Sequence, residues 1–178
     1  MKHALFLVLA FGLSGAAHAA DKKPVGGPCV LAPALRHAVQ ERFGSARVLS
    51  ATDLFEDERK LFIEAHKAAC PGLRTGHFFG SKAQTRPATA LVLLDIGPKK
   101  EARLIVARPA GKTWVFVEVQ TMDSGSTAVI STEGPGSYKD ETRTLTAKDD
   151  VVVLTGYGSW RRVYVWNGKT FDSVKTTD

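Results

Sequence analysis

The residues best suited to binding chemistry lie close together near the C-terminal end of this 178-residue chain. In the segment GYGSWRR, Tyr157 lies between two glycines, and Trp160 directly precedes Arg161 and Arg162. Tyrosine, tryptophan and arginine dominate binding hot spots because each combines a large contact area with a polar group. The segment therefore predicts a binding surface. The alternative is an ordinary hairpin, in which the tryptophan packs on a sheet and the arginines face solvent.

A second candidate surface is the segment EGPGSYKDE, residues 133–141, which carries Tyr138. It is long for a connection between neighbouring strands, and such loops often carry function. The alternative is a surface loop without a binding role. Together the two segments give the expected binding residues: Tyr138, Tyr157, Trp160, Arg161 and Arg162.

The histidines and acidic residues give no positive sign of catalysis. His37, His66 and His77 are not spaced four apart on a helix, and no acidic residue joins them in a metal-ligand pattern. Asp149 and Asp150 are adjacent, so on a strand they would point to opposite faces. Nucleophile-elbow, phosphate-loop, zinc-protease and haem motifs are absent from the sequence. We expect no catalytic residue, cofactor or metal; the alternative is a hydrolase acting on the cell envelope, with His77 as base beside a carboxylate.

Two cysteines, Cys29 and Cys70, predict a single disulfide. The bond would close a loop of about 41 residues, which the chain-entropy model values at about 4 kcal/mol of stability. A catalytic or metal-binding thiol would require a second nearby ligand or a CxxC spacing, and the sequence has neither. The disulfide would tie the N-terminal third of the chain to the rest.

The first 20 residues have the features of an export signal. Lys2 supplies a positive start, residues 5–13 an apolar run, and Ala17-His18-Ala19 a small-x-small cleavage motif. We expect cleavage after Ala19 or Ala20. The apolar run is about half the length that a membrane-spanning helix needs. The sequence therefore predicts a protein of the periplasm or exterior, without a membrane span.

Charge limits the classes of partner. The formal net charge is +6. Lys2 is the only charged residue of the expected signal, so its removal would leave a net charge of +5. Basic residues are scattered and never exceed two in a row, so the basic stripe with interleaved aromatics typical of nucleic-acid binding is missing. We expect a neutral or acidic protein, or an anionic cell-envelope polymer, as partner and no nucleic acid.

The elements that position these residues begin with two helices, which follow a flexible tail at 21–28. Residues 31–43 show helical spacing of apolar positions, with Pro33 in the first turn and Gly44 past the end. A second helix is predicted from Asp53 as N-cap, with Glu56 as its capping-box partner, to Cys70, because Pro71 disfavours helical geometry before it. Its expected apolar face consists of Leu54, Leu61, Phe62, Ala65 and Ala69.

Beyond Cys70 the pattern changes to alternation and β-branched runs, which predict strands. The expected strands are 76–79, 89–96, 102–107, 113–120, a weak one at 128–131 or 142–146, 151–155, 161–166 and 170–174. Asn167-Gly168 favours a two-residue type I′ turn between the last two. Short connections make neighbouring strands antiparallel. We expect residues 29–178 to form one α+β domain, with two N-terminal helices packed on a twisted antiparallel meander that is barrel-like or propeller-blade-like.

The most distinctive stretch is Cys70-Pro71-Gly72, followed by the Gly-x-Phe-x-Gly of residues 76–80, a polar loop and an apolar strand. Over residues 70–94, and again in the YVWNGKTF of the closing strands within 151–174, the chain resembles small exported bacterial β-domains of the FG-GAP or VCBS repeat type. The resemblance implies a fold. Where such repeats carry calcium-binding acids, this chain has Gly80, Ser81, Lys82, Ala83 and Gln84, so we expect no calcium site.

Taken together, the sequence predicts a non-enzymatic exported binding domain that docks on a protein or envelope polymer through loop aromatics and arginines. A cell-wall hydrolase is one such partner, for which the chain would be an inhibitor or immunity protein, by fold-level analogy. The other hypotheses are the His77 hydrolase and a purely structural accessory module.

Overall fold

A computed structural model describes residues 29–66, 70–80, 86–95, 101–123, 128–156 and 160–176. The expected signal peptide at 1–20 and tail at 21–28 lie outside these residues. The described chain is mostly antiparallel β-sheet with two short α-helices, broadly the α+β class that the sequence predicts. None of the helices in this part of the chain is long and apolar enough to cross a bilayer.

Helix α1 (Pro33–Phe43) begins two residues later than the predicted segment 31–43 and ends where it was predicted to end. Pro33 occupies the first turn, where its missing N–H costs nothing. Gly44 ends the helix with a φ of 61°, and its N–H donates to the Gln40 carbonyl at 2.9 Å. The helix buries Leu35 and Val39.

The start of the second helix was predicted wrongly. Asp53 ends a short 3₁₀ helix, η1 (Ala51–Asp53), and its carboxylate accepts the backbone N–H of Ser50 at 2.8 Å, so it caps this turn instead. Helix α2 (Glu56–His66) begins three residues later. Arg47 explains the difference, because its guanidinium holds the Asp53 carboxylate in a two-pronged ion pair at 2.5 and 2.6 Å.

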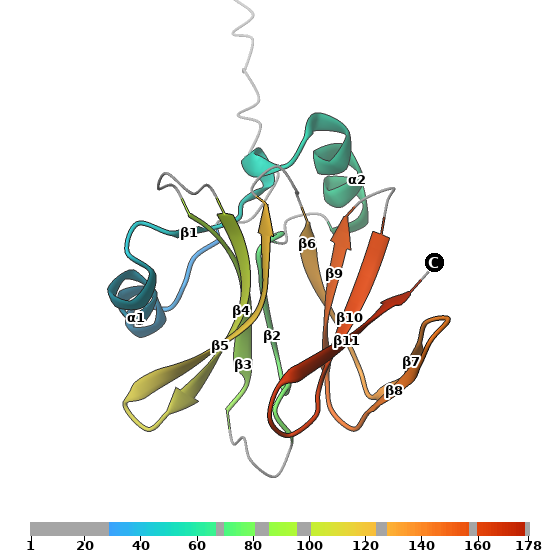
Figure 1. Cartoon of the computed structure of the whole chain (residues 1–178). Helices are drawn as coiled ribbons and strands as arrows, with labels where there is room; N and C mark the ends of the chain where they lie inside the picture. Colours follow the sequence, from blue (N-terminus) through green and yellow to red (C-terminus); the bar gives the residue numbers. More distant parts are fainter. Residues whose placement is uncertain are drawn as a thin grey trace, which may run out of the picture.

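The apolar face of α2 is also narrower than predicted. Phe62 is fully buried, whereas Leu61 is 49% exposed and Ala65 is exposed. The helix lies across one end of the β-structure (Figure 1), where it inserts one ring into the core. The expected end of this helix, including Ala69, falls on residues 67–69, outside the described part of the chain.

The strands form three separate antiparallel sheets (Figure 1). The first sheet contains β1 (Arg47–Val48), β2 (Leu73–Gly76), β3 (Ala88–Leu94), β4 (Glu101–Ala110) and β5 (Thr113–Asp123), in the order β1-β3-β4-β5 with β2 also on β3. The second contains β6 (Val129–Glu133), β9 (Val151–Gly156), β10 (Trp160–Trp166) and β11 (Phe171–Thr176), in the order β11-β10-β9-β6. The hairpin of β7 (Gly136–Lys139) and β8 (Thr144–Ala147) is the third.

This arrangement corrects the expected single meander, whether barrel-like or blade-like. None of the three described sheets closes on itself. The first two sheets bury apolar side chains against each other, and this shared core includes Val92, Leu104, Ile130 and Leu154. Strand β6 pairs with β9 because the β7–β8 hairpin is inserted between them in sequence and folds outward.

Outer layers cover both sheets (Figure 1). Helix α1 packs Leu35 and Val39 on the outer face of the first sheet, against Leu91, Leu93 and Ile105. On the far side, the β7–β8 hairpin packs on the valines of the outer face of the second sheet: Val151, Val153, Val163, Val165 and Val174.

Along one side, a backbone hydrogen bond joins the two packed sheets. There the Ile130 N–H donates to the Pro71 carbonyl at 2.8 Å, so that the chain before β2 is bonded to β6. At the opposite side lie the outer strands β5 and β11, and each pairs with a single described neighbour, β4 and β10 respectively. We call the region between β5 and the β10–β11 pair the open seam.

Three local predictions need correction. The expected strand at 76–79 is shifted, since β2 ends at Gly76 and both Phe78 and Phe79 are buried in the turn that follows. A Cβ at Gly76 would lie 2.7 Å from the Phe78 ring, so the bend requires glycine there. The expected loop at 133–141 contains strand β7. Both weak strand candidates exist, as β6 and β8.

The closing hairpin is confirmed, but its turn is shifted by one residue. The Asn167 N–H donates to the Thr170 carbonyl at 3.0 Å, so Gly168 and Lys169 are the central residues. The Asn167 side-chain oxygen accepts the N–H groups of Lys169 and Thr170, each at 2.8 Å. Asparagine therefore stabilises the turn from its side chain, and Gly168 supplies the positive φ of 101°.

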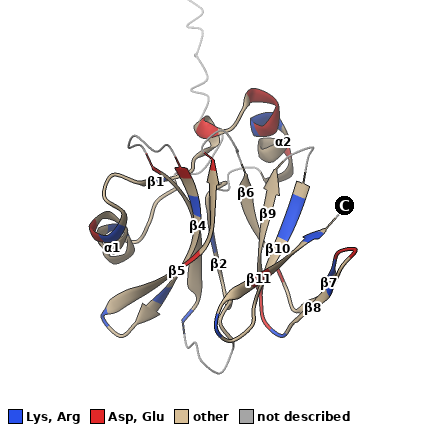
Figure 2. Ribbon diagram, in the orientation of Figure 1, with Lys and Arg blue, Asp and Glu red and all other residues tan. Residues whose placement is uncertain are grey.

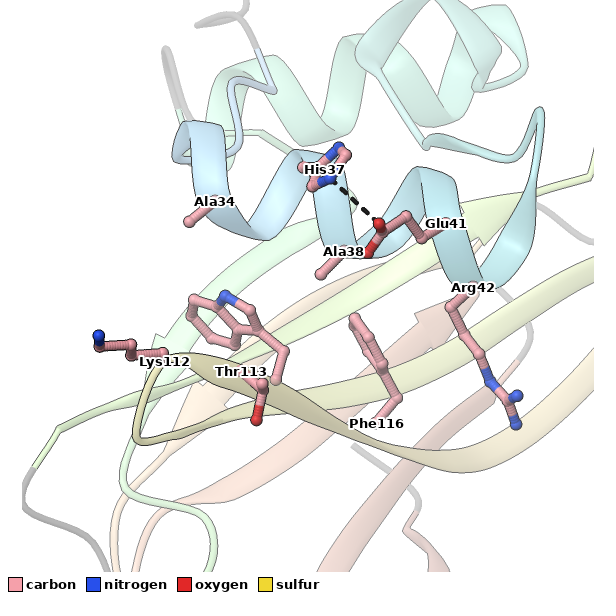
Figure 3. Close-up of a pocket in the computed structure, with 9 residues that line it drawn as sticks. Ala34, His37, Ala38, Glu41, Arg42, Lys112, Thr113 and Phe116 are labelled. Atoms are coloured by element: carbon pink, nitrogen blue, oxygen red, sulfur yellow. Dashed lines mark ion pairs between the residues drawn. The ribbon is translucent and has the colours of Figure 1, made fainter.

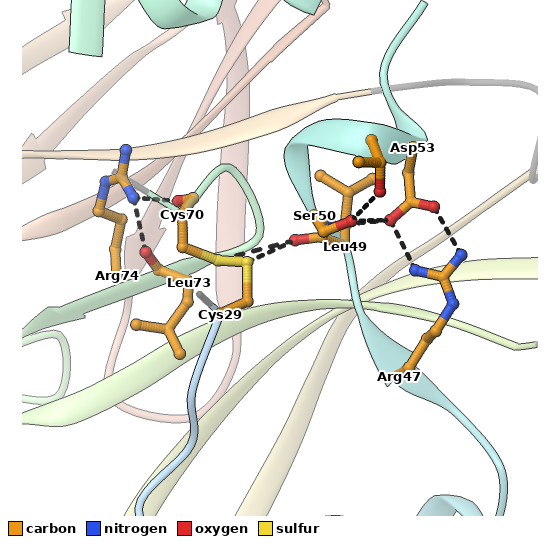
Figure 4. Close-up of a disulfide and its surroundings, with 9 residues drawn as sticks. Cys29, Arg47, Leu49, Ser50, Asp53, Cys70, Leu73 and Arg74 are labelled. Carbon is orange, nitrogen blue, oxygen red and sulfur yellow. Dashed lines mark hydrogen bonds and ion pairs between the residues drawn. A yellow bond between two sulfur atoms is a disulfide. The ribbon is translucent and has the colours of Figure 1, made fainter. Parts of the chain in front are cut away.

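The predicted disulfide is present. Cys29 and Cys70 are bonded, with their Cα atoms 5.2 Å apart (Figure 4). The Leu49 carbonyl oxygen lies 3.2 Å from the Cys29 sulfur, and this is a packing contact because a disulfide has no proton to donate. The bond joins the segment before α1 to the segment before β2.

Candidate functional site

Strand β10 carries most of the predicted binding residues, but it divides them between two faces. Trp160 and Arg162 share the inner face with Tyr164, which is part of the central core. Arg161 lies on the outer face with Val163, toward the β7–β8 hairpin that holds Tyr138. Tyr157 lies outside the described residues. The expected residues therefore do not form one patch.

The outer-face residues are engaged in contacts within the protein. The Tyr138 hydroxyl donates to the Gly134 carbonyl at 2.6 Å, and partial burial raises the pKa of this phenol. Its ring packs on the valine layer of the second sheet. Arg161 forms an ion pair with Glu133 and also donates to the Thr176 hydroxyl. The contacts of Arg161 tie β6 and the last strand to β10.

The inner-face residues line a pocket in the open seam. Trp160, Arg162, Lys175 and Gln120 enclose about 220 Å³, and we call this the seam pocket. Lys175 lies directly opposite Arg162 in the β10–β11 register. Figure 2 shows basic residues on β10 and toward the end of β11, the strands that carry this pair. Gln120 comes from the other sheet, so both sheets contribute to the pocket.

A β-bulge in β5 places Gln120 there. The β4–β5 register shifts between Leu104 and Ile105, which pair with Gln120 and Glu118 and leave Val119 as the extra residue. Leu104 points into the central core, so its partner Gln120 also lies on the inner face. Val117 and Val119 face the same core, so strict alternation along β5 would have placed Gln120 on the outer face. The bulge therefore turns Gln120 toward the second sheet.

Gln120 links the two sheets by hydrogen bonds. Its side-chain oxygen accepts from the Tyr164 hydroxyl and, at 3.5 Å, from an Arg162 nitrogen. Burial raises the pKa of Tyr164 to about 12, against a smaller opposing effect of Arg162, so the phenol keeps its proton and can donate. The amide nitrogen of Gln120 remains a possible donor to a bound group.

The charge of the seam pocket is positive. Arg162 and Lys175 are a directly opposed like-charge pair, an arrangement that destabilises a sheet. Among the described residues, neither forms an ion pair with a carboxylate, whereas the adjacent Arg161 pairs with Glu133. Two cationic donors, a glutamine amide and an indole in one concavity suit a phosphate or carboxylate group.

His77, the base of the alternative hydrolase hypothesis, is exposed. Its backbone N–H donates to the Asp150 carboxylate at 2.8 Å. This bond fixes the turn after β2 and uses no atom of the imidazole ring. No cluster of three or more metal-ligating side chains occurs in the described part of the chain. Residues 81–84, most of the polar loop in which we expect no calcium site, fall outside the described part of the chain.

Sequence reasoning missed Gln120 and Lys175. Neither belongs to a motif, and their places depend on a register shift and on pairing between strands. Comparison with protein-family models, curated proteins and solved structures finds no match to this chain. The resemblance to FG-GAP or VCBS repeats remains a hypothesis.

Proposed function

We propose that this chain is an exported, non-enzymatic binding domain that docks on a partner carrying phosphate or carboxylate groups, through the seam pocket. An anionic cell-envelope polymer is the partner that we favour, because such polymers repeat these groups along their length. The inhibitor hypothesis is a narrower form of the proposal, in which the anion is a carboxylate on a cell-wall hydrolase. A basic hydrolase surface would be repelled by this pocket.

One contrast carries the proposal. Arg161 and Arg162 are adjacent in β10, yet only Arg161 has a carboxylate partner among the described residues. Arg162 is half-buried and lies opposite Lys175. Two cations held close together without an acid lower the stability of the fold. An external anion would relieve this repulsion and gain charge-assisted hydrogen bonds.

The test is an NMR titration of the disulfide-bonded protein with inorganic phosphate and with acetate, following the Trp160 indole N–H. We expect a saturable shift in the wild type and its loss in Arg162→Gln. Arg161→Gln is the matched control, because it removes the same charge one residue away on the opposite face. Absence of a saturable shift with either anion, or equal weakening by both variants, would overturn the proposal.

A second measurement identifies the source of the anion. Retention of the protein on immobilised poly(glycerol phosphate) is compared with retention on an immobilised acidic protein, at increasing salt. We expect stronger retention on the polymer, with a smaller salt dependence in Arg162→Gln than in Arg161→Gln. Preferential retention on the acidic protein would instead support the inhibitor form.

A further inference from the structure

A second concavity lies on the outer face of the first sheet, between α1 and the β4–β5 hairpin (Figure 3). It encloses about 620 Å³, and we call it the helix groove. One wall is the α1 stripe of Ala34, Ala38 and Arg42, and the other is formed by Trp114 and Phe116 of β5. It shares no lining residue with the seam pocket.

The groove exists because small side chains face large ones. Leu35 and Val39 bring α1 onto the first sheet, but in the neighbouring stripe of the helix Ala34 and Ala38 are the residues beside Trp114 and Phe116. The Phe116 ring is fixed by an edge-to-face contact with Phe43, with centroids 5.3 Å apart. Both β5 aromatics are half-buried and line the groove.

Cations flank this apolar surface. Figure 3 shows Lys112 at one end of the groove and Arg42 at the other, with Ala38 and Phe116 between them. The acid of the groove, Glu41, has its Oε1 atom 3.1 Å from Nε2 of His37, so its carboxylate is turned toward this ring. No described ion pair includes Arg42 or Lys112. The groove thus offers an apolar centre and a positive charge at each end.

The rim between the cations is polar. His37, Glu41 and Thr113 supply both donors and acceptors beside the aromatic wall. Sugar rings match this combination, since they have apolar C–H faces for aromatic packing and hydroxyls at their edges. Carboxylates on the sugars would match Arg42 and Lys112. From Ala34 to Arg42 the helix rises about 12 Å, room for a short run of linked rings.

We propose that the helix groove binds an acidic oligosaccharide, whose sugar faces pack on Trp114 and Phe116 and whose carboxylates meet Lys112 and Arg42. Charge complementarity selects an acidic glycan over a neutral one. The mixed donors and acceptors of the rim favour hydroxylated rings over an acidic peptide. This proposal goes beyond the seam pocket and does not depend on it.

The test is titration of the ¹⁵N-labelled, disulfide-bonded protein with tetragalacturonate, following the Trp114 indole N–H. We expect saturable binding that shifts this resonance. Ala38→Leu fills the groove with a good helix former and should weaken binding at least tenfold. Lys112→Gln should weaken it several-fold, and it stays informative if Ala38→Leu fails to fold.

Matched controls separate the groove from general charge and helix effects. Gln40→Leu, like Ala38→Leu, places a leucine on α1, but at an exposed position. Lys169→Gln, like Lys112→Gln, removes an exposed lysine charge, but in the turn between β10 and β11. Both should bind as the wild type does. Arg162→Gln alters only the seam pocket, so it should leave the titration at the Trp114 resonance unchanged.

Three outcomes would overturn the proposal. The first is absence of saturable tetragalacturonate binding. The second is equal or tighter binding of tetraglutamate at the Trp114 resonance, which would mark the groove as a peptide site. The third is binding that Ala38→Leu and Lys112→Gln leave unchanged while Arg162→Gln abolishes it, which would place the glycan in the seam pocket. A neutral galactose tetramer should bind more weakly than the acidic one.

Discussion

Adjacent arginines in one strand have different surroundings here, because successive side chains of a strand point to opposite faces. Arg161 stabilises the outer face through Glu133, whereas Arg162 lies beside Lys175 and Gln120 on the inner face. At the scale of single residues, the hydrogen bonds from Tyr164 and Arg162 to Gln120 join the two sheets at the seam, and the one from the Tyr164 hydroxyl is the shorter.

Removal of that bond gives the first prediction. Tyr164→Phe should lower the free energy of unfolding by about 1 kcal/mol, since the half-buried oxygen of Gln120 loses its closer donor. Tyr138→Phe, which removes the exposed bond to Gly134, should cost less. Urea denaturation at neutral pH measures both. An equal loss in the two variants would contradict the linking role of Tyr164.

Tyr164 should also make the stability of the fold depend on pH in the alkaline range. Its pKa in the folded protein is about 12, above the usual 10.0, so the unfolded chain ionises first as the pH rises. The stability that this difference contributes is present below pH 10 and is lost as the pH rises toward 12. In the same denaturation assay, Tyr164→Phe should show a weaker dependence on pH over this interval than the wild type.

Asp53 should make the stability of the fold depend on pH in the acid range. Hydrogen bonds from Arg47 hold its pKa at about 2, below the usual 3.8. Because the folded-state pKa is the lower one, its stabilising contribution is present above pH 3.8 and is lost as the pH falls through about 2. Asp53→Asn should therefore flatten the dependence of the urea midpoint on pH in this interval.

Asp57→Asn is the control for this acid effect, because Asp57 is exposed in α2. It should leave the slope unchanged. Some dependence should persist in Asp53→Asn, since hydrogen bonds from Thr142 and Arg143 also lower the pKa of Asp140 to about 2. A slope identical to that of the wild type would show that the Arg47 pair contributes nothing to acid stability.

At the scale of elements, the two helices have different roles despite equal length. Helix α1 covers a sheet face and buries two aliphatic side chains there, whereas α2 covers an end of the sandwich and buries Phe62. Strand β5 serves both concavities: Trp114 and Phe116 line the helix groove, and the bulge at Val119 turns Gln120 into the seam pocket.

This difference predicts unequal mutational costs. Leu35→Ala in α1 should lower the free energy of unfolding by about 2–4 kcal/mol, because it leaves a cavity against the first sheet. Leu61→Ala in α2 should cost under about 1 kcal/mol, since this side chain is 49% exposed. Chemical denaturation of both variants checks the prediction, and a larger loss for Leu61→Ala would contradict the placement of α2.

For the whole molecule, four layers follow one another: α1, the first sheet, the second sheet and the β7–β8 hairpin (Figure 1). The packed sheets are bonded to each other at the β2–β6 side, and the disulfide joins two chain segments that lead into the first sheet. Neither cysteine lines the seam pocket or the helix groove.

The disulfide gives the prediction at this scale. A Cys29→Ser, Cys70→Ser double variant should lose about 4 kcal/mol of stability, because the unfolded chain regains the freedom of a 41-residue loop. Urea denaturation of the wild type with and without reductant, beside the double variant, measures the loss. Reductant should leave the variant unaffected. A loss below 1 kcal/mol would show that packing alone holds the segment before α1.

The sequence by itself determined the local features of this protein: the first helix, the antiparallel pairing, the closing hairpin and the disulfide. Each depends on neighbouring residues or on the presence of just two cysteines. Periodicity and turn chemistry act over a few positions, so Pro33, Gly44 and Asn167 could be interpreted directly. The binding role of Trp160 and Arg162 stays a prediction.

Only the tertiary structure decided which side chains meet. The division into separate sheets, the inward turn of Gln120 and the opposition of Arg162 to Lys175 depend on register between segments far apart in the chain. Asp53 caps a different turn than expected because Arg47 reaches it, and Leu61 is exposed because α2 covers only an end of the core. Such contacts are set by long-range packing, which no local pattern of residues records.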